Sequence, residues 1–247
     1  MKYRSLLHLS VFFFIFALTY EKLDLTTYYA VNTIKNNNWK DLLDTVVECP
    51  NRGVMKNFII RRNSTHYWFE YQCYSTLSND WDYGESIIKQ VKSYIDNSGD
   101  SNNYNYNYNY DSSINNLNGY KIGCRVDYCL NYFQLYLYRG LRQDTLCHGV
   151  KTTYTSAITF STEKKLVNKN SMDGLFDVLV GRTDEETDEN VGFPLRGFKI
   201  VVESIQWSNN VNVYFQYAYS ILRNMTVIRD SYKKRFEQLR NSNTQKN

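Results

Sequence analysis

The sequence has few of the residues from which catalytic sites are built. Only 3 of its 247 residues are histidine, and it contains no glycine-rich phosphate-binding loop, no His-Glu-x-x-His helix and no Gly-x-Ser-x-Gly motif. Cys147 and His148 are neighbours in the sequence, and neighbours in a strand point to opposite faces, so they do not make a nucleophile and base pair. We therefore predict that the protein is not an enzyme and needs no cofactor.

An excess of charge of one sign is also missing. The 29 lysine and arginine residues are nearly balanced by 25 acidic residues, and the formal net charge is +4. A charge this weak and evenly mixed is not typical of a nucleic-acid-binding protein. We expect no nucleic-acid partner, and charge alone identifies no other.

Long hydrophobic runs are absent after residue 19, where no segment approaches the roughly 18 unbroken apolar residues of a membrane-spanning helix. The apolar run at residues 5–18 follows Lys2 and Arg4, and Ala17 and Thr19 at its end have cleavage spacing. This pattern is typical of a secretory signal peptide, which we place at residues 1–19. An uncleaved anchor is the alternative. We expect a secreted, extracellular or lumenal protein.

Aromatic residues are abundant. The sequence contains 23 tyrosines and 13 phenylalanines, but only 2 prolines. Tyrosine and phenylalanine favour pleated, half-buried strands, and the composition argues against a helical bundle. The predicted fold is all-β.

One hydrophobic pattern recurs three times and indicates internal repeats. Residues 55–60, 130–135 and 195–200 each contain an apolar residue, then phenylalanine three positions later, then a second apolar residue two positions after that. Residues 69–73 and 215–219 alternate with a period of two, as strands with one buried face do. Each repeat is predicted to be a strand, a hairpin loop and a returning strand.

All five cysteines follow the predicted signal peptide. In the extracellular compartment that this peptide implies, disulfides form and persist. Cys73 follows Cys49 by 24 residues and Cys147 follows Cys124 by 23, so two repeats share one cysteine frame. We favour the pairs Cys49–Cys73 and Cys124–Cys147, although four cysteines allow three pairings. Cys129 is then a buried inert thiol or, alternatively, the link of a disulfide-bonded dimer.

The repeats set the expected domain boundaries. We place a three-repeat β domain at residues 49–226, after an N-terminal segment at 20–48. The Asn- and Tyr-rich residues 96–118 are predicted to be a disordered surface insert. Residues 227–247 place apolar residues at helical spacing, which predicts a short C-terminal helix and tail. In the third repeat Tyr219 stands where the first has a cysteine, so packing is expected to replace the disulfide.

Several positions are candidates for modification or binding. Asn63-Ser-Thr and Asn224-Met-Thr are N-glycosylation sequons. Two basic clusters are candidates for binding sulfated sugars or anionic lipid, with a solvated face as the alternative for each. They consist of Arg61 and Arg62, and of Lys233, Lys234 and Arg235. The acidic residues at 80–82 and 184–189 lack a recognised calcium-binding spacing, so we expect no metal site.

The first repeat resembles that of the dermatopontin family. Cys49-Pro-Asn-Arg-Gly53 leads into an apolar strand that closes with Phe69-Glu-Tyr-Gln-Cys73, and Trp39 and the high tyrosine content fit as well. The chain departs from the family at Thr65-His-Tyr-Trp68, where the family has Asp-Arg-x-Trp, and the third repeat has no cysteine. The resemblance implies a secreted, non-enzymatic extracellular-matrix or cell-adhesion protein that binds glycans, proteoglycans or matrix proteins.

Three β repeats of this size also resemble the β-prism modules of vitelline membrane outer layer proteins and of the carboxy-terminal domains of apicomplexan perforin-like proteins. This resemblance implies a pseudo-threefold, β-prism-like all-β domain. It also implies peripheral membrane contact, as in a toxin-like or parasite secreted protein. A secreted hydrolase, which needs only two carboxylates, is the remaining alternative.

Overall fold

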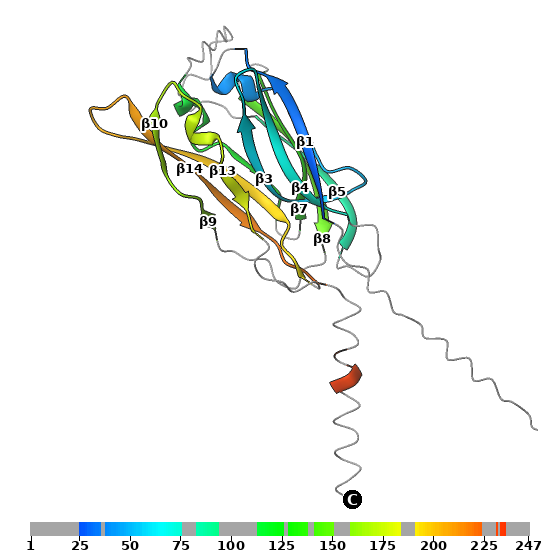
Figure 1. The fold of residues 1–247 in the computed structure, drawn as a ribbon. Coiled ribbons are helices and arrows are strands. Elements are labelled where there is room, and N and C mark those ends of the chain that lie inside the picture. Colours follow the sequence, from blue (N-terminus) through cyan, green and yellow to red (C-terminus); the bar gives the residue numbers. More distant parts are fainter. Residues whose placement is uncertain are drawn as a thin grey trace, which may run out of the picture.

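The structure is a computed structural model of the 247-residue chain. It describes residues 25–35, 38–75, 83–93, 113–125, 128–137, 141–150, 159–183, 191–223, 231 and 233–235. These residues form fifteen β-strands and three short 3-10 helices (Figure 1), and residues 231 and 233–235 are helical. The all-β prediction is therefore confirmed. No helix among them has the length and apolar character needed to span a bilayer.

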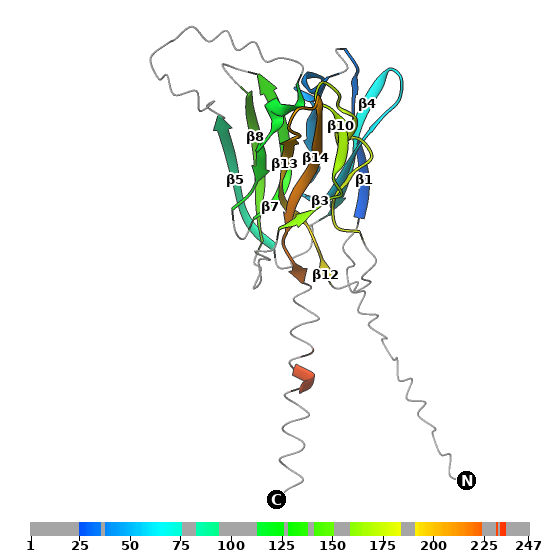
Figure 2. The same cartoon turned by 90° about the vertical axis from the view of Figure 1, so that its left-hand side faces the viewer.

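Three long antiparallel hairpins form the centres of the three larger sheets (Figure 2). They consist of β3 (Val54–Arg62) with β4 (His66–Tyr74), β7 (Tyr128–Leu137) with β8 (Leu141–Val150), and β13 (Leu195–Ser204) with β14 (Asn210–Tyr219). Each hairpin contains one copy of the hydrophobic pattern in its first strand. The predicted order of strand, loop and returning strand is therefore confirmed in all three places.

The three sheets share one strand order, in which an outer strand pairs with the returning strand and a short lead strand pairs with the first strand. The outer strands are β1 (Leu25–Thr33), β5 (Tyr83–Ser93) and β10 (Lys165–Asn168). The lead strands are β2 (Val46–Glu48), β6 (Lys121–Gly123) and β11 (Leu179–Gly181). A lead strand precedes one hairpin in sequence but pairs with another: β2 with β7, β6 with β13 and β11 with β3. The lead strands thus link the hairpins in a closed ring.

The remaining elements are short. The 3-10 helices η1 (Trp39–Leu42), η2 (Ile114–Leu117) and η3 (Asp173–Leu175) each precede a lead strand. β9 (Phe160–Ser161) pairs with β14, and β12 (Val191–Gly192) pairs with β15 (Leu222–Arg223). Each 3-10 helix contributes one buried leucine to the core: Leu42, Leu117 and Leu175.

The phenylalanines of the three patterns meet in the core. Phe58 lies 5.7 Å from Phe133 and 4.8 Å from Phe198, and Phe133 lies 5.2 Å from Phe198, measured between ring centroids. All three side chains are buried. Aromatic pairs at these distances contribute about 0.5–1.5 kcal/mol each beyond their burial. The contacts are compatible with the three-repeat prism, which stays a prediction.

A β-bulge interrupts each hairpin at the second position of the pattern. The residues at the three register shifts are Lys56, Asn131 and Arg196. A bulge places an extra residue in one strand and re-aims its side chain. Lys56 and Asn131 are buried, whereas Arg196 is only half-buried.

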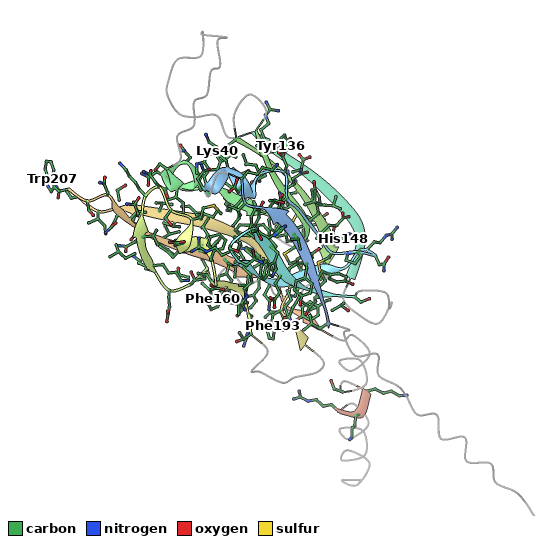
Figure 3. The ribbon with its side chains drawn as sticks, turned by 45° about the horizontal axis from the view of Figure 1, so that its top comes forward. Lys40, Tyr136, His148, Phe160, Phe193 and Trp207 are labelled. Carbon is green, nitrogen blue, oxygen red and sulfur yellow. A yellow bond between two sulfur atoms is a disulfide. The ribbon has the colours of Figure 1, made fainter. Side chains whose placement is uncertain are left out.

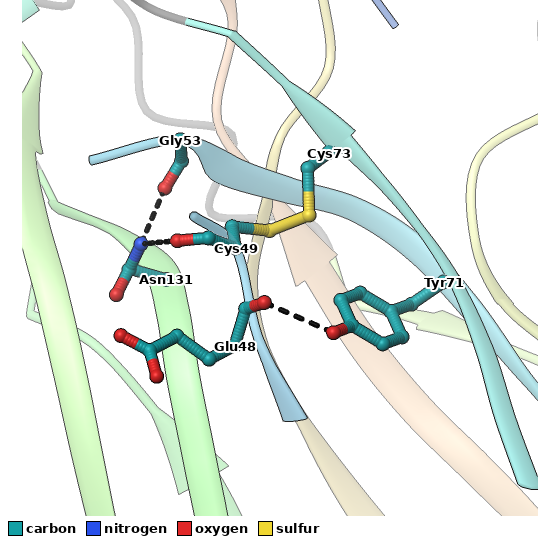
Figure 4. Close-up of a disulfide and its surroundings, with 6 residues drawn as sticks. All are labelled: Glu48, Cys49, Gly53, Tyr71, Cys73 and Asn131. Carbon is teal, nitrogen blue, oxygen red and sulfur yellow. Dashed lines mark hydrogen bonds between the residues drawn. A yellow bond between two sulfur atoms is a disulfide. The ribbon is translucent and has the colours of Figure 1, made fainter. Parts of the chain in front are cut away.

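Both disulfides have the predicted pairing. Cys49 is bonded to Cys73, and Cys124 is bonded to Cys147. The amide nitrogen of the buried Asn131 donates hydrogen bonds to the carbonyl oxygens of Cys49, at 2.8 Å, and of Gly53, at 2.6 Å (Figure 4). A side chain from the second hairpin therefore fixes the chain next to the disulfide of the first.

The third hairpin has a non-covalent contact at the corresponding place. Arg182 directly follows the lead strand β11, as Cys49 follows β2 and Cys124 follows β6. Its Nη1 donates to the hydroxyl oxygen of Tyr219 at 3.3 Å, and its guanidinium carbon lies 5.5 Å from the centre of that ring. Packing therefore replaces the disulfide, as expected.

The β domain extends beyond its predicted start at residue 49. β1 pairs with β4 along its whole length, from Leu25 opposite Tyr74 to Thr33 opposite His66. The insert predicted at 96–118 also ends earlier than residue 118, because Ile114 is buried in the core. The predicted signal peptide at 1–19 and residues 96–112 of the predicted insert lie outside the described residues.

Candidate functional site: a basic pocket on the third sheet

Arg61 and Arg62 lie at the end of β3, where acidic side chains neutralise them. Nη1 of Arg61 lies 2.7 Å from a carboxylate oxygen of Asp177, and Nε lies 3.6 Å from one of Glu70. The hydrogen bond to Asp177 raises the pKa of Arg61 above its usual value. Nη2 of Arg62 lies 2.5 Å from a carboxylate oxygen of Asp173. Both arginines tie β3 to the region around η3 and are poorly placed to bind an anion.

The second predicted basic cluster lies elsewhere. Lys233, Lys234 and Arg235 are helical and exposed. This helical turn and the loop between β3 and β4 lie at opposite ends of the molecule (Figure 2). The two basic clusters therefore do not form one surface.

Asn63 lies in the exposed turn between β3 and β4. Its Oδ1 accepts hydrogen bonds from the backbone nitrogen of Thr65 at 2.9 Å and from that of His66 at 2.8 Å. The hydroxyl of Thr65 donates to the same oxygen at 3.2 Å. The turn presents the sequon to solvent, and its glycosylation stays a prediction. Asn224 lies outside the described residues.

The thiols and histidines offer no nucleophile pair within the described residues. Cys147 is held in a disulfide, and burial together with the charge of Arg52 lowers the pKa of His148 to about 4. Cys129 is a free, fully buried thiol, and its burial raises its pKa to about 12. A protonated thiol without solvent access is unreactive, so its burial argues against a disulfide between chains. His66 is exposed at the start of β4.

Acidic side chains form no metal site in the part of the chain that the structure describes. No group of three or more histidine, cysteine, aspartate or glutamate side chains there could hold a metal ion. The acidic residues at 80–82 and 184–189 lie outside the described ranges.

A different set of cations gathers on the outer face of the third sheet, where a pocket has a volume of about 170 Å³. Lys121 of β6, Lys199 of β13 and the bulge residue Arg196 line it, together with the polar side chains of Thr159 and Gln216. Lys199 alternates with buried residues of β13, and alternate residues of a strand point to opposite faces. Its side chain therefore points away from the core.

The register places the cations unfavourably for stability. Lys121 lies directly opposite Lys199 in the pairing of β6 with β13, and Gln216 lies opposite Lys199 on the other side. Like charges directly opposite each other destabilise a sheet. The pocket is lined by no acidic residue, and among the described residues no carboxylate forms an ion pair with Lys121, Arg196 or Lys199.

Two facing glycines line the pocket. Gly123 lies opposite Gly197 in the same register. A Cβ atom on Gly197 would lie 2.5 Å from the Cα of Gly123 and 2.5 Å from the carbonyl oxygen of Ile122, so no larger residue fits there. Gly197 thus lets β6 approach β13 closely, whereas a Cβ on Gly123 would meet nothing nearer than 3.6 Å, so the open space lies over Gly123. The arrangement suits an anionic group, because lysine and arginine donate strong hydrogen bonds to sulfate or carboxylate oxygens.

Sequence reasoning missed this pocket. Lys121 is far from Lys199 in the sequence, and neither belongs to a basic run. Only the register that brings β6 beside β13 reveals that the two lysines face each other. The alternation of Lys199 with apolar residues indicates an outward-facing side chain, but it does not identify what lies beside it.

A second hollow of about 370 Å³ lies between β11 and the segment joining β9 to β10. Three of its four charged lining residues, namely Asp177, Lys165 and Arg182, already have partners within the protein. Asp177 pairs with Arg61, and Nζ of Lys165 donates to the carbonyl oxygen of Phe176 at 2.5 Å. The guanidinium carbon of Arg182 lies 3.9 Å from the centre of the ring of Phe193. This hollow is a weaker candidate than the basic pocket.

The turn between β13 and β14 is a third surface feature. Trp207 is 96% exposed and projects from the body of the molecule (Figure 3). Ile205 in the same turn is 36% exposed, and residues 205–209 include no charged side chain. The basic pocket and this exposed tip are both candidate binding features.

Comparison with known proteins identifies no relative of the chain. No family model matches it, and neither the curated proteins nor the solved structures contain a significant match. The resemblance to dermatopontins therefore stays a prediction that rests on sequence motifs.

Proposed function

We propose that the protein is a secreted, non-catalytic component of the extracellular matrix or cell surface that binds sulfated glycans, such as the chains of proteoglycans. The observation that supports this most is the unneutralised pair of Lys121 and Lys199 beside Arg196. A bound sulfate would relieve the repulsion between the lysines and accept hydrogen bonds from all three side chains. The two disulfides favour an oxidising, extracellular compartment.

A sulfated chain suits this pocket better than a neutral sugar. Three cations and no carboxylate line the hollow, so a neutral sugar would leave the lysine repulsion in place. The pocket also opens on a sheet face rather than in a deep cavity, which allows a long polymer to pass over it.

The test is retention of the full secreted chain on immobilised heparin across a salt gradient, with desulfated heparin as the comparison matrix. We expect retention on heparin that weakens with salt, because exposed ionic contacts are screened. Lys121→Gln, Lys199→Gln and Arg196→Gln should each weaken binding by about 1 kcal/mol, or roughly fivefold in Kd.

Lys164→Gln is the matched control. It removes the same charge, but Nζ of Lys164 lies 2.7 Å from a carboxylate oxygen of Glu203 and does not line the pocket. If Lys164→Gln weakens retention as much as Lys121→Gln does, net charge rather than the pocket determines binding. Equal retention on desulfated heparin would contradict the proposal.

Peripheral membrane binding is the second candidate, and the exposed tip at Trp207 favours it. Tryptophan is enriched at membrane interfaces, where its ring meets apolar chains and its N–H meets water. The test is co-sedimentation with vesicles of neutral and of anionic lipid. Trp207→Ser should abolish this binding, whereas Leu166→Ser, at a position 61% exposed on β10, should not. Binding that persists in Trp207→Ser would eliminate the tip as the membrane contact.

A further inference from the structure

Among the described residues, the outer strand β1 is a long edge strand of the first sheet. It pairs with β4 on one side, and within the described ranges no strand pairs with its other side. In Figure 2, β1 lies at the outer margin of the molecule. A free edge presents a row of backbone donors and acceptors to another chain.

The hydrogen bonds at the end of β1 show which residues face outward. The backbone nitrogen of Ile34 donates to the carbonyl oxygen of Thr65 at 2.9 Å, toward the neighbouring strand. The backbone nitrogen of Thr33 instead donates to Oδ1 of Asn32 at 2.8 Å. Because antiparallel pairs alternate, the odd-numbered residues direct their N–H and C=O groups away from β4. These outward residues are Leu25, Thr27, Tyr29 and Val31.

The same residues also expose their side chains. Val31 is 62% exposed, Tyr29 60% and Leu25 36%. Tyr28 and Ala30 between them pack against the core. The outward row therefore offers apolar side chains together with unpaired backbone groups.

β1 lacks the features that usually protect an edge strand. Its nine residues include no charge and no proline, and its pairing with β4 continues without a bulge. By contrast, β5 contains Lys89 and Lys92 and a register shift, and β10 has four residues. The edge strands β2, β6 and β11 have three residues each. Charge, bulges and shortness discourage strand addition, so β1 is the edge best suited to it.

We propose that two copies of this chain pair through β1 in an antiparallel, twofold-symmetric manner centred on Tyr29. A twofold axis at the middle of the nine residues places Tyr29 opposite its own copy and Thr27 opposite Val31. Every residue of the strand then has a partner, and no charges oppose each other. The two four-stranded sheets become one continuous sheet. This proposal does not depend on glycan binding.

The occupant is a second copy because the strand is complementary to itself. A twofold interface uses the same surface on both partners, so it requires that no like charges meet, and β1 meets this condition. An extended segment of another protein is the alternative partner for this edge. If the pure chain is monomeric, a second copy is excluded and that alternative is the one left.

The first test is sedimentation velocity of the full secreted chain over a range of concentrations, without glycan. We expect a concentration-dependent equilibrium between monomer and dimer. Tyr29→Lys and Tyr29→Glu should each abolish the dimer, because each places like charges at the twofold axis. An equimolar mixture of the two variants should recover a dimer. Leu166→Lys, a charge at a position 61% exposed on a different edge, should leave the dimer unchanged.

Cross-linking tests the register. Tyr29→Cys should give a disulfide-linked dimer under mild oxidation, because the two positions face each other across the axis. Thr33→Cys should not, since position 33 faces position 25 of the partner. Cys129 is buried and does not compete. A monomer at all concentrations, a mixture that fails to dimerise, or equal cross-linking of both variants would overturn the proposal.

Discussion

Arg182 contacts Tyr219 at the place where each of the first two hairpins has a disulfide. The guanidinium lies within cation-π distance of the tyrosine ring, a contact that contributes about 0.5–2 kcal/mol. A disulfide closing a loop of this size contributes more, about 3–4 kcal/mol in the chain-entropy model. The contact that closes the third hairpin is therefore weaker than the disulfides that close the other two.

Replacing this pair by cysteines should create a third disulfide. We expect the double variant Arg182→Cys with Tyr219→Cys to form the bond under oxidising conditions and to gain roughly 3 kcal/mol in the free energy of unfolding. Peptide mapping without reduction detects the bond, and urea unfolding measures the gain. Each single variant, which leaves one thiol, is the control. Two free thiols in the folded double variant would show that positions 182 and 219 are not equivalent to the cysteine pairs.

Asn131→Ala should destabilise the first and second hairpins together. The substitution leaves the buried carbonyl oxygens of Cys49 and Gly53 without their donor, at a cost of about 2–4 kcal/mol. Urea unfolding measures the loss. Asn170→Ala, at an exposed position, should change the free energy of unfolding by less than about 0.5 kcal/mol. Equal effects at the two positions would contradict the bridging role of Asn131.

The two facing glycines should respond differently to alanine. Gly197→Ala forces a Cβ against the backbone of β6 and should cost about 2 kcal/mol or more. A Cβ on Gly123 meets its nearest neighbour at 3.6 Å, an ordinary contact. Gly123→Ala should therefore keep the thermal midpoint while reducing the space in the basic pocket and weakening heparin retention. Unfolding of Gly123→Ala would show that the hollow serves packing rather than binding.

His148 should make the protein sensitive to acid. Its pKa in the folded state is lowered to about 4 by burial, below the value of about 6.5 in an unfolded chain. The unfolded state thus binds the additional proton as the pH falls from about 6.5 to 4, and stability is lost over that range, by roughly 3 kcal/mol in total. Urea unfolding at pH 7 and at pH 4.5 measures this loss in the free energy of unfolding. The loss should be smaller in His148→Gln, because glutamine does not bind the proton.

Cys129 should not react with thiol reagents in the folded protein. Burial raises its pKa to about 12, so the thiolate is scarce and the reagent has no access. Reaction with a maleimide should be negligible in buffer and reach one thiol per chain in denaturant. Rapid modification in buffer would show that the thiol is exposed. Non-reducing electrophoresis should show no disulfide-linked dimer.

The sequence predicts those features of the fold that depend on one residue type at a fixed spacing. The cysteine pairs and the core phenylalanines Phe58, Phe133 and Phe198 are of this kind, because each occurs at the same place in more than one repeat. The lead strands are not predictable in this way. Three residues are too few to show a period, and each pairs with a hairpin that it does not precede.

The basic site depends on contacts between distant residues. Arg61 looks like a binding residue in the sequence, but Asp177, which neutralises it, lies 116 positions away. Lys121 and Lys199 look unremarkable until the sheet register places them opposite each other. Charge compensation is a property of the assembled sheets, so composition and local spacing could not reveal which cations stay available.

The ring of lead strands has a consequence for folding in the cell. β11, at residues 179–181 of the 247, completes the sheet that begins with β1, so the first sheet cannot close until more than two thirds of the protein has been synthesised. Pairings this distant in sequence make folding slow. We expect the edge of β3 in the nascent first hairpin to stay unpaired until β11 is synthesised. The disulfide between Cys49 and Cys73 holds the ends of this hairpin together during that time. The three sheets then form in one cooperative step.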